Sequence, residues 1–292
     1  MIRLFLCLLL LCISDAGWAV PPYLLGAKLA NSELTSQLSH VERKLQAEGF
    51  VVVGRYVPAG LVDRATIVVT DSDILAAIRT IGGSAIVAAG IRVSVQADGT
   101  VSYMNPDYWY RAYLRTEFSS AQVAVQSVQA RLAHALGGNS SFGGDVPATE
   151  LAGYRYMIGM ERFDSPRSEL QTHASFQQAL DTVRANLASR VASTSQVYEI
   201  VMPEREIAVF GVAMNDPSTG ESWWANKIGA DHVAGLPYEM FIVGNKVYAL
   251  YARYRIALAW PSLGMGQFMG IINAPSAIQT TLGDVAAASV AH

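Results

Sequence analysis

The same order of motifs occurs twice along this chain of 292 residues, and this repeat constrains the fold more than any other feature. An Ile-Gly pair, an Ala-Gly pair and a hairpin turn follow one another after residue 80 and again after residue 227. Aligning Gly90 with Gly235 also aligns the glycines of the two turns, Gly99 and Gly244. Such self-similarity indicates one supersecondary unit present in two copies.

Hydrophobic periodicity predicts a helix, two strands, a short helix and a hairpin in each copy. The opening helices are expected at residues 32–48 and 175–190, and the first hairpin turns at Asp98-Gly99, which tolerates positive φ. The second hairpin is expected to join strands at 238–243 and 246–257. The predicted fold is α+β, with two similar units packed as a pseudo-dimer. Each unit is a mainly antiparallel sheet with helices on one face.

This pattern divides the chain into four segments. They are a signal peptide (1–19), a first α+β repeat (32–136), a Gly/Ser-rich linker (137–150) and a second α+β repeat (151–290). An aromatic group from Tyr103 to Tyr113 is expected at the interface between the copies, because rings with polar tips suit such a surface.

The amino terminus predicts export. Arg3 precedes the apolar run from Leu4 to Ile13, and small residues at Gly17 and Ala19 predict cleavage before Val20. The compartment would be the periplasm in a Gram-negative organism and the exterior otherwise. The chain has two cysteines, and both lie in this segment, so a cleaved protein would have no disulfide, thiol nucleophile or cysteine metal ligand.

Composition narrows the classes of function. The formal net charge is −3, and 15% of residues are charged. The chain lacks the run of Lys or Arg that would predict a nucleic-acid partner. After the signal, no apolar stretch reaches the ~20 residues of a membrane-spanning helix. No nucleophile elbow, phosphate-binding loop or dinucleotide fingerprint occurs, so no cofactor is predicted and a non-enzymatic role is favoured.

Several segments resemble exported, tandem members of the family called domain of unknown function 302. They are Leu151-Ala152-Gly153-Tyr154-Arg155-Tyr156-Met157-Ile158-Gly159-Met160-Glu161-Arg162-Phe163, Ala234-Gly235-Leu236-Pro237-Tyr238-Glu239, Arg253-Tyr254-Arg255-Ile256-Ala257, and the hairpin and turn at residues 98–106. The resemblance covers most of residues 32–290. It implies a compact α+β unit that pairs with a second unit, and it carries over no catalytic residue.

Polar residues found in one copy alone are the candidates for a ligand site. They are Asp231, His232, Trp223, Trp224, Glu239, Arg253 and Arg255. In the alignment, Asp231 and His232 replace Ile86 and Val87, and a histidine beside a carboxylate could bind an anion or act as an acid–base pair. Two arginines two positions apart on a strand would share a face suited to a carboxylate or phosphate. The alternative is structural: a loop cap, a surface histidine, core tryptophans and an ion pair to Glu239.

Methionine offers a second kind of site, because thioethers bind copper(I). Met157 with Met160, and Met265 with Met269, would each place two sulfurs on one face if their segments are helical. Core packing is the competing explanation.

The favoured function is therefore an exported binding or accessory protein of the cell envelope that holds a small ligand or a protein partner. One alternative is an enzyme that uses His232 with Asp231 or Glu239, and another is a copper(I)-binding protein that uses the methionine pairs.

Overall fold

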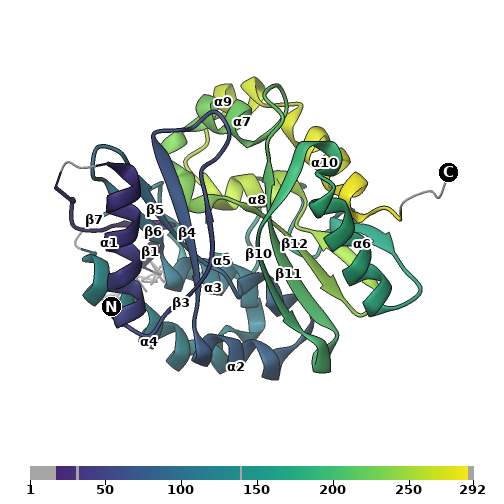
Figure 1. The fold of residues 1–292 in the computed structure, drawn as a ribbon, viewed down its shortest axis with the longest axis horizontal. Helices are drawn as coiled ribbons and strands as arrows, with labels where there is room; N and C mark the ends of the chain where they lie inside the picture. Colours follow the sequence, from purple (N-terminus) through teal and green to yellow (C-terminus); the bar gives the residue numbers. More distant parts are fainter. Residues whose placement is uncertain (1–17, 31–32, 139, 289–292) are drawn as a thin grey trace, which may run out of the picture.

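The computed structural model describes residues 18–30, 33–138 and 140–288 (Figure 1). Helices combine with antiparallel sheets, which confirms the predicted α+β class. The predicted signal peptide lies outside the described residues up to position 17. The chain is described from Trp18, and Ala19–Val20 form the short strand β1, which pairs with β8.

The first sheet has the strand order β3-β4-β5-β6-β2-β7, and the second has the order β10-β11-β12-β13-β9. The strands of the first sheet are β2 (Tyr23–Leu25), β3 (Val51–Tyr56), β4 (Arg64–Thr70), β5 (Ile91–Gln96), β6 (Val101–Met104) and β7 (Ser140–Phe142). Those of the second are β9 (Glu169–Thr172), β10 (Thr194–Met202), β11 (Ile207–Met214), β12 (Tyr238–Val243) and β13 (Lys246–Ala249), and β8 is Val146–Pro147.

The helices are α1 (Leu34–Ala47), α2 (Ser72–Ile81), α3 (Pro106–Leu114), α4 (Phe118–Leu136), α5 (Ala148–Leu151), α6 (Phe176–Ala188), α7 (Glu221–Ile228), α8 (Ala252–Ala259), α9 (Met265–Gly270) and α10 (Ala274–Ala286). The 3₁₀ turns are η1 (Gly83–Ala88), η2 (Arg115–Glu117), η3 (Pro166–Ser168), η4 (Val191–Ser193), η5 (Pro203–Arg205) and η6 (Ala230–Gly235). Asp71 caps α2 as predicted, since its side chain accepts hydrogen bonds from the amides of Asp73 and Ile74.

The two halves have the same topology. In each, a helix precedes two strands, then a helix with a 3₁₀ turn, then a hairpin and a further helix, and the four strands are neighbours in sequence order. The first strand of each half also has a register shift at the same place, after Val52 in β3 and after Gln196 in β10. A register shift at the same place in both halves supports their equivalence, because a bulge is a distinctive feature that alters the twist of its strand.

These registers change the residue equivalences that the sequence alignment gave. Beyond the bulges, Gly54 pairs with Val68 and Tyr198 pairs with Gly211. The next strands then place Arg92 opposite Val68 and Glu239 opposite Gly211. Arg92 and Glu239 are therefore equivalent.

The two 3₁₀ turns follow the same spacing, so the position equivalent to His232 is Ala85, and the position equivalent to Asp231 is Ser84. The alignment to Ile86 and Val87 was wrong, because it matched two Ala-Gly pairs that lie two residues apart in the two halves.

The halves exchange contacts reciprocally. The hydroxyl of Tyr108 in α3 donates to the carbonyl of Leu258 in α8 at 2.9 Å, and that of Tyr254 in α8 donates to the carbonyl of Ala112 in α3 at 3.4 Å. The turn η6 likewise packs on β4, β5 and β6, while η1 packs on β11 and β12. The aromatic segment ending at Tyr113 thus contacts the second half, as the sequence predicted.

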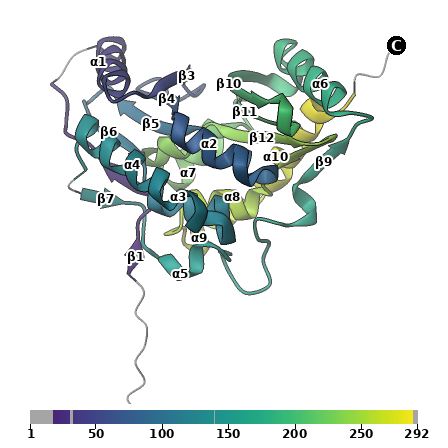
Figure 2. The same cartoon turned by 90° about the horizontal axis from the view of Figure 1, so that it is seen from below.

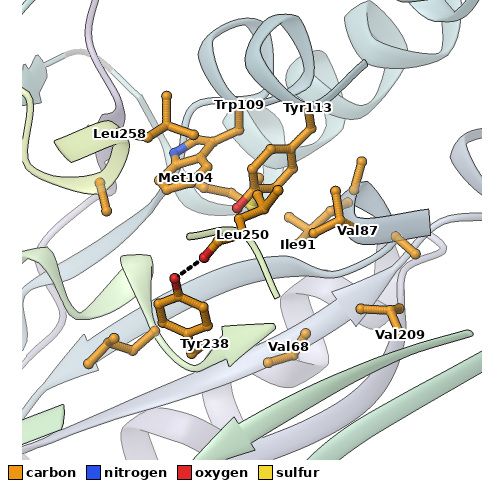
Figure 3. Packing of buried hydrophobic residues seen from close by; sticks show 14 of the residues in the cluster. Val68, Val87, Ile91, Met104, Trp109, Tyr113, Val209, Tyr238, Leu250 and Leu258 are labelled. Atoms are coloured by element: carbon orange, nitrogen blue, oxygen red, sulfur yellow. Dashed lines mark hydrogen bonds between the residues drawn. The ribbon is translucent and has the colours of Figure 1, made fainter. Parts of the chain in front are cut away.

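Strands β4 and β11 are covered on both faces. Every residue of β11 is buried, and so is every residue of β4 after Arg64, although successive side chains in a strand point to opposite faces. Helix α1 packs on β3, β4 and β5, and the turn from the other half covers the face that carries Thr66, whose hydroxyl donates to the carbonyl of Val233. The sequence predicted helices on one face but not this second layer. Figure 3 shows the resulting core, with side chains of α3, β4 and β12 packed together.

The Gly/Ser-rich segment at residues 137–150, which was predicted to be a linker, contains a strand. Ser140–Phe142 form β7, which pairs with β2 and extends the first sheet. Gly137 and Gly143 have positive φ, which lets the chain turn sharply on both sides of this strand. Small residues therefore permit tight turns here, and backbone pairing fixes the segment.

Candidate functional site

A buried cluster of three charged side chains lies where the halves meet. Nη1 of Arg92 contacts Oε1 of Glu239, and Nε of Arg255 donates to Oε2 of Glu239 at 2.8 Å. None of the three side chains is more than 2% exposed. The equivalent positions of the two halves thus hold opposite charges that meet in the core.

The cluster has two guanidinium groups and one carboxylate, so other groups must offset the additional positive charge. Nε of Arg92 donates to the carbonyl of Ala234 at 3.0 Å, and Nη2 of Arg255 donates to that of Gly235 at 2.6 Å. Both guanidinium carbons lie over the indole of Trp109, at 4.8 and 4.9 Å from the ring centroid. A desolvated charge is tolerated when it is paired, hydrogen-bonded or held over an aromatic ring. The cluster therefore links the two halves through paired charges, and loss of one partner would leave a buried charge uncompensated.

Arg253 and Arg255 do not share a face. The expected strand 246–257 ends at Ala249, and both arginines lie in the helix α8. On a helix, residues two apart point in different directions. Arg255 accordingly enters the core, whereas Arg253 is 37% exposed and lies 3.8 Å from Glu161. The predicted paired guanidinium site was wrong, and the alternative ion pair between Glu239 and Arg255 is present.

His232 lies among aromatic rings. Its ring stacks on Trp260 with centroids 5.4 Å apart, and the rings of Tyr23 and Phe142 meet it edge-on, each at 5.2 Å. Both ring nitrogens are buried, and neither has a hydrogen-bond partner within the part of the chain that the structure describes. Burial lowers the pKa of His232 to about 4, so the imidazole is neutral at pH 7.

The carboxylates proposed as partners of His232 bind other groups. Asp231 has a side chain 75% exposed and lies 3.6 Å from Arg64, and Glu239 belongs to the central cluster. Trp224 is buried against Trp260, whereas Trp223 is half-buried with the ammonium of Lys227 over its ring. The seven candidate residues therefore do not form one site.

Replacing His232 with Phe should reduce acid sensitivity. Its folded pKa lies below the unfolded value of 6.5, so the stability present above pH 6.5 is lost as the pH falls toward 4. A difference of this size corresponds to about 3 kcal/mol. We expect urea unfolding to show a smaller loss between pH 7.5 and 4.5 for His232→Phe than for wild type. Replacing the exposed His40 with Phe is the control, and parallel losses in all three proteins would contradict the prediction.

A pocket of about 290 Å³ opens where the two halves meet the segment that connects them. Ser84 and Arg115 come from the first half, and Phe241 and Tyr248 come from the hairpin of the second. The other lining residues are Phe163, Asp164, Ser165, Ser168 and Val243. The rings of Phe241 and Tyr248 stack with centroids 5.4 Å apart and form an apolar wall.

Arg115 is the positively charged residue that lines this pocket, and its side chain contacts neighbouring residues. It begins η2 with a positive φ of 53°, a conformation that is costly for a residue with a side chain. Its guanidinium carbon lies 4.2 Å from the ring centroid of Phe163, and Nη2 donates to the hydroxyl of Ser84 at 3.4 Å. Its Nε is buried and has no partner among the described groups. Asp164 is exposed, and no ion pair joins it to Arg115 in the described part of the chain.

Sequence reasoning missed Arg115, Arg92 and Glu221. Arg92 could have been found, because it interrupts the apolar strand around Val93 in a chain with few charges. Glu221 is buried and accepts hydrogen bonds from Tyr56 and from two backbone amides, and burial raises its pKa to about 7. No local pattern marks Arg115, since its environment comes from three separate segments.

The methionine pairs are only partly helical. Met265 and Met269 lie in α9 and are both exposed, whereas Met157 and Met160 lie in an irregular turn. Among the described residues, no group of three or more His, Cys, Asp or Glu side chains could hold a metal ion.

Within the described ranges, no helix is both long and apolar enough to span a membrane. Comparison of the chain with protein-family models, with curated proteins and with solved structures found no match in any of the three. The resemblance to domain of unknown function 302 stays a prediction.

Proposed function

We propose that this chain is an exported, non-enzymatic binding protein of the cell envelope, built as a pseudo-dimer of two fused units, which holds a small ligand in the pocket around Arg115. The reciprocal contacts of α3 and α8 support the pseudo-dimer, and the apolar run of residues 4–13 supports export. The observation that carries the proposal is the half-buried guanidinium of Arg115 at the wall of a pocket, whose buried Nε has no hydrogen-bond partner among residues 18–30, 33–138 and 140–288.

The lining defines the chemical class of the ligand. A guanidinium binds carboxylates with charge-assisted hydrogen bonds, and stacked aromatic rings favour a flat apolar group. A volume of about 290 Å³ is close to the lower end of the range for small-molecule sites. We therefore assign a compact carboxylate with an aromatic or apolar body. The carboxylate of Asp164 at the rim also suits a ligand that carries an amine.

Calorimetric titration with phenylpropionate, indole-3-acetate and phenylalanine tests this proposal. We expect at least one of the three to bind, and Arg115→Met to weaken that binding about 10-fold or more, since a hydrogen bond to a charged group contributes roughly 1.5–3 kcal/mol. Arg184→Met is the matched control, because Arg184 pairs with Glu199 away from the residues that line the pocket.

Native mass spectrometry of protein purified from its own compartment would show whether a ligand is retained. Absence of binding by all three probes together with absence of a retained ligand would contradict the proposal. Equal binding by wild type and Arg115→Met would contradict the assignment of the site.

A further inference from the structure

Five exposed aliphatic or thioether side chains gather on two neighbouring segments. They are Met157 (42% exposed), Ile158 (89%), Met265 (52%), Met269 (57%) and Ile272 (43%), and we call them the methionine face. Large apolar side chains exposed together commonly mark a surface that contacts a protein or a membrane. This surface shares no residue with the pocket around Arg115, so its role is independent of the proposed ligand.

A packed pair of rings joins the two segments. Tyr156 stacks on Phe268 of α9 with centroids 5.8 Å apart, and its hydroxyl donates to the carbonyl of Leu263 at 2.6 Å. This contact holds the exposed turn after α5 against α9, next to Met157 and Ile158 in the chain. In Figure 2, α5 and α9 lie on the side of the molecule away from α1 and α6.

The charges around the methionine face are mainly positive. No charged residue occurs between Arg255 and Asp284, so α9 and its flanks are neutral. Lys227 is exposed and donates to the carbonyl of Gly270 at the end of α9.

Two further cations flank the exposed turn. Arg155 and Arg162 are exposed, and both line a hollow of about 470 Å³ that also contains Met157 and Ile158. Glu150 lies in the same hollow, whereas Glu161 is paired with Arg167. A hollow with two guanidinium groups beside exposed apolar side chains matches the phosphate headgroup and acyl chains of an anionic lipid.

We propose that the methionine face binds peripherally to the surface of an anionic lipid bilayer. Ile158 and the side chains of α9 enter the headgroup region, while Arg155, Arg162 and Lys227 contact lipid phosphates. A lipid occupant is favoured by the position of the charges, because Arg155 and Arg162 line one hollow with the apolar Met157 and Ile158, as a phosphate headgroup above acyl chains requires.

Co-sedimentation with vesicles tests this inference. The full chain purified from its own compartment should sediment with vesicles of phosphatidylglycerol and phosphatidylethanolamine, more weakly with phosphatidylcholine, and less as salt increases. The double variant Ile158→Asp/Met265→Asp should lower the affinity at least 10-fold. The matched control is Val62→Asp/Val123→Asp, which alters side chains that are 79% and 81% exposed elsewhere and should bind as wild type.

A second variant separates charge from apolar insertion. Arg155→Glu/Arg162→Glu should weaken binding to phosphatidylglycerol vesicles and leave the weak binding to phosphatidylcholine unchanged. Circular dichroism confirms that each variant is folded. Failure of the wild-type protein to sediment with pure phosphatidylglycerol vesicles at low salt would overturn the inference, as would equal loss of binding in the Val62→Asp/Val123→Asp control.

Discussion

Replacing Glu239 with Ala is expected to lower the free energy of unfolding by roughly 3–5 kcal/mol, because it leaves two buried guanidinium groups without a counter-charge. Arg92 and Arg255 are 0% and 2% exposed, so water cannot take the place of the carboxylate without opening the interface. Urea denaturation followed by circular dichroism measures the loss.

Two comparisons separate this effect from general damage. Glu204→Ala removes one partner of an exposed ion pair with Arg79 and should have little effect, because solvent screens the pair. A triple variant with apolar residues at positions 92, 239 and 255 should recover much of the stability lost by Glu239→Ala, since apolar groups need no counter-charge. Similar small losses for Glu239→Ala and Glu204→Ala would contradict a stabilising role for the central cluster.

Replacing Tyr198 with Ala should cost about 4 kcal/mol, because its ring fills the space beside two glycines, Gly90 and Gly211. A side-chain carbon added at Gly211 would lie 2.2 Å from Cε1 of Tyr198, and one added at Gly54 or Gly90 would lie within 3 Å of Tyr198 atoms. The ring is 2% exposed and cannot move into solvent.

The hydroxyl of Tyr198 provides a matched control. This hydroxyl is buried and has no hydrogen-bond partner among the described side chains and backbone groups, so Tyr198→Phe should be neutral or slightly stabilising. Thermal and urea unfolding of the two variants measure the difference, and a loss for Phe as large as that for Ala would contradict filling of space as the role of this ring.

A double-mutant cycle tests the coupling between Tyr198 and Gly211. Gly211→Ala alone should cost about 2–3 kcal/mol through overlap with the ring, and much less in the Tyr198→Ala background. Gly153→Ala, where an added carbon meets no atom within 4 Å, should have little effect. Additive losses from the two substitutions would indicate that the close approach does not limit packing here.

The equivalence of Gly54 and Tyr198 explains why the two copies differ at this contact. The strands β3 and β10 contact each other there, and a side-chain carbon added at Gly54 would lie 2.6 Å from the carbonyl oxygen of Val197 and 2.9 Å from Cβ of Tyr198. The first copy therefore has Gly54 and Val68 where the second has Tyr198 and Gly211. Equivalent positions of the two halves therefore lie close together here, and dense packing requires different side chains on the two sides.

Local patterns in the sequence predicted most of the elements. The apolar stripe from Leu34 to Leu45 became α1, Asp71 capped α2, and the turn glycines 99 and 244 have positive φ. These features depend on residues within a few positions of one another, so periodicity and turn chemistry suffice to find them.

Elements whose form depends on distant contacts were not predicted. Residues 252–259 were expected to continue a strand but form α8, in which Tyr254 and Arg255 donate hydrogen bonds to the other half and to β12. The glycines of residues 137–144 suggested a free linker, but pairing with β2 ordered their neighbours into a strand.

The sequence by itself determined the α+β class and the positions of elements such as α1 and α2, because these follow from composition and short-range patterns. Only the tertiary structure decided which polar residues meet. It paired Arg92 with Glu239, separated His232 from both carboxylates and placed Arg115 beside Phe163. The physical reason is that burial and the approach of distant strands set the free energy of a charged group, and neither is encoded within a window of neighbouring residues.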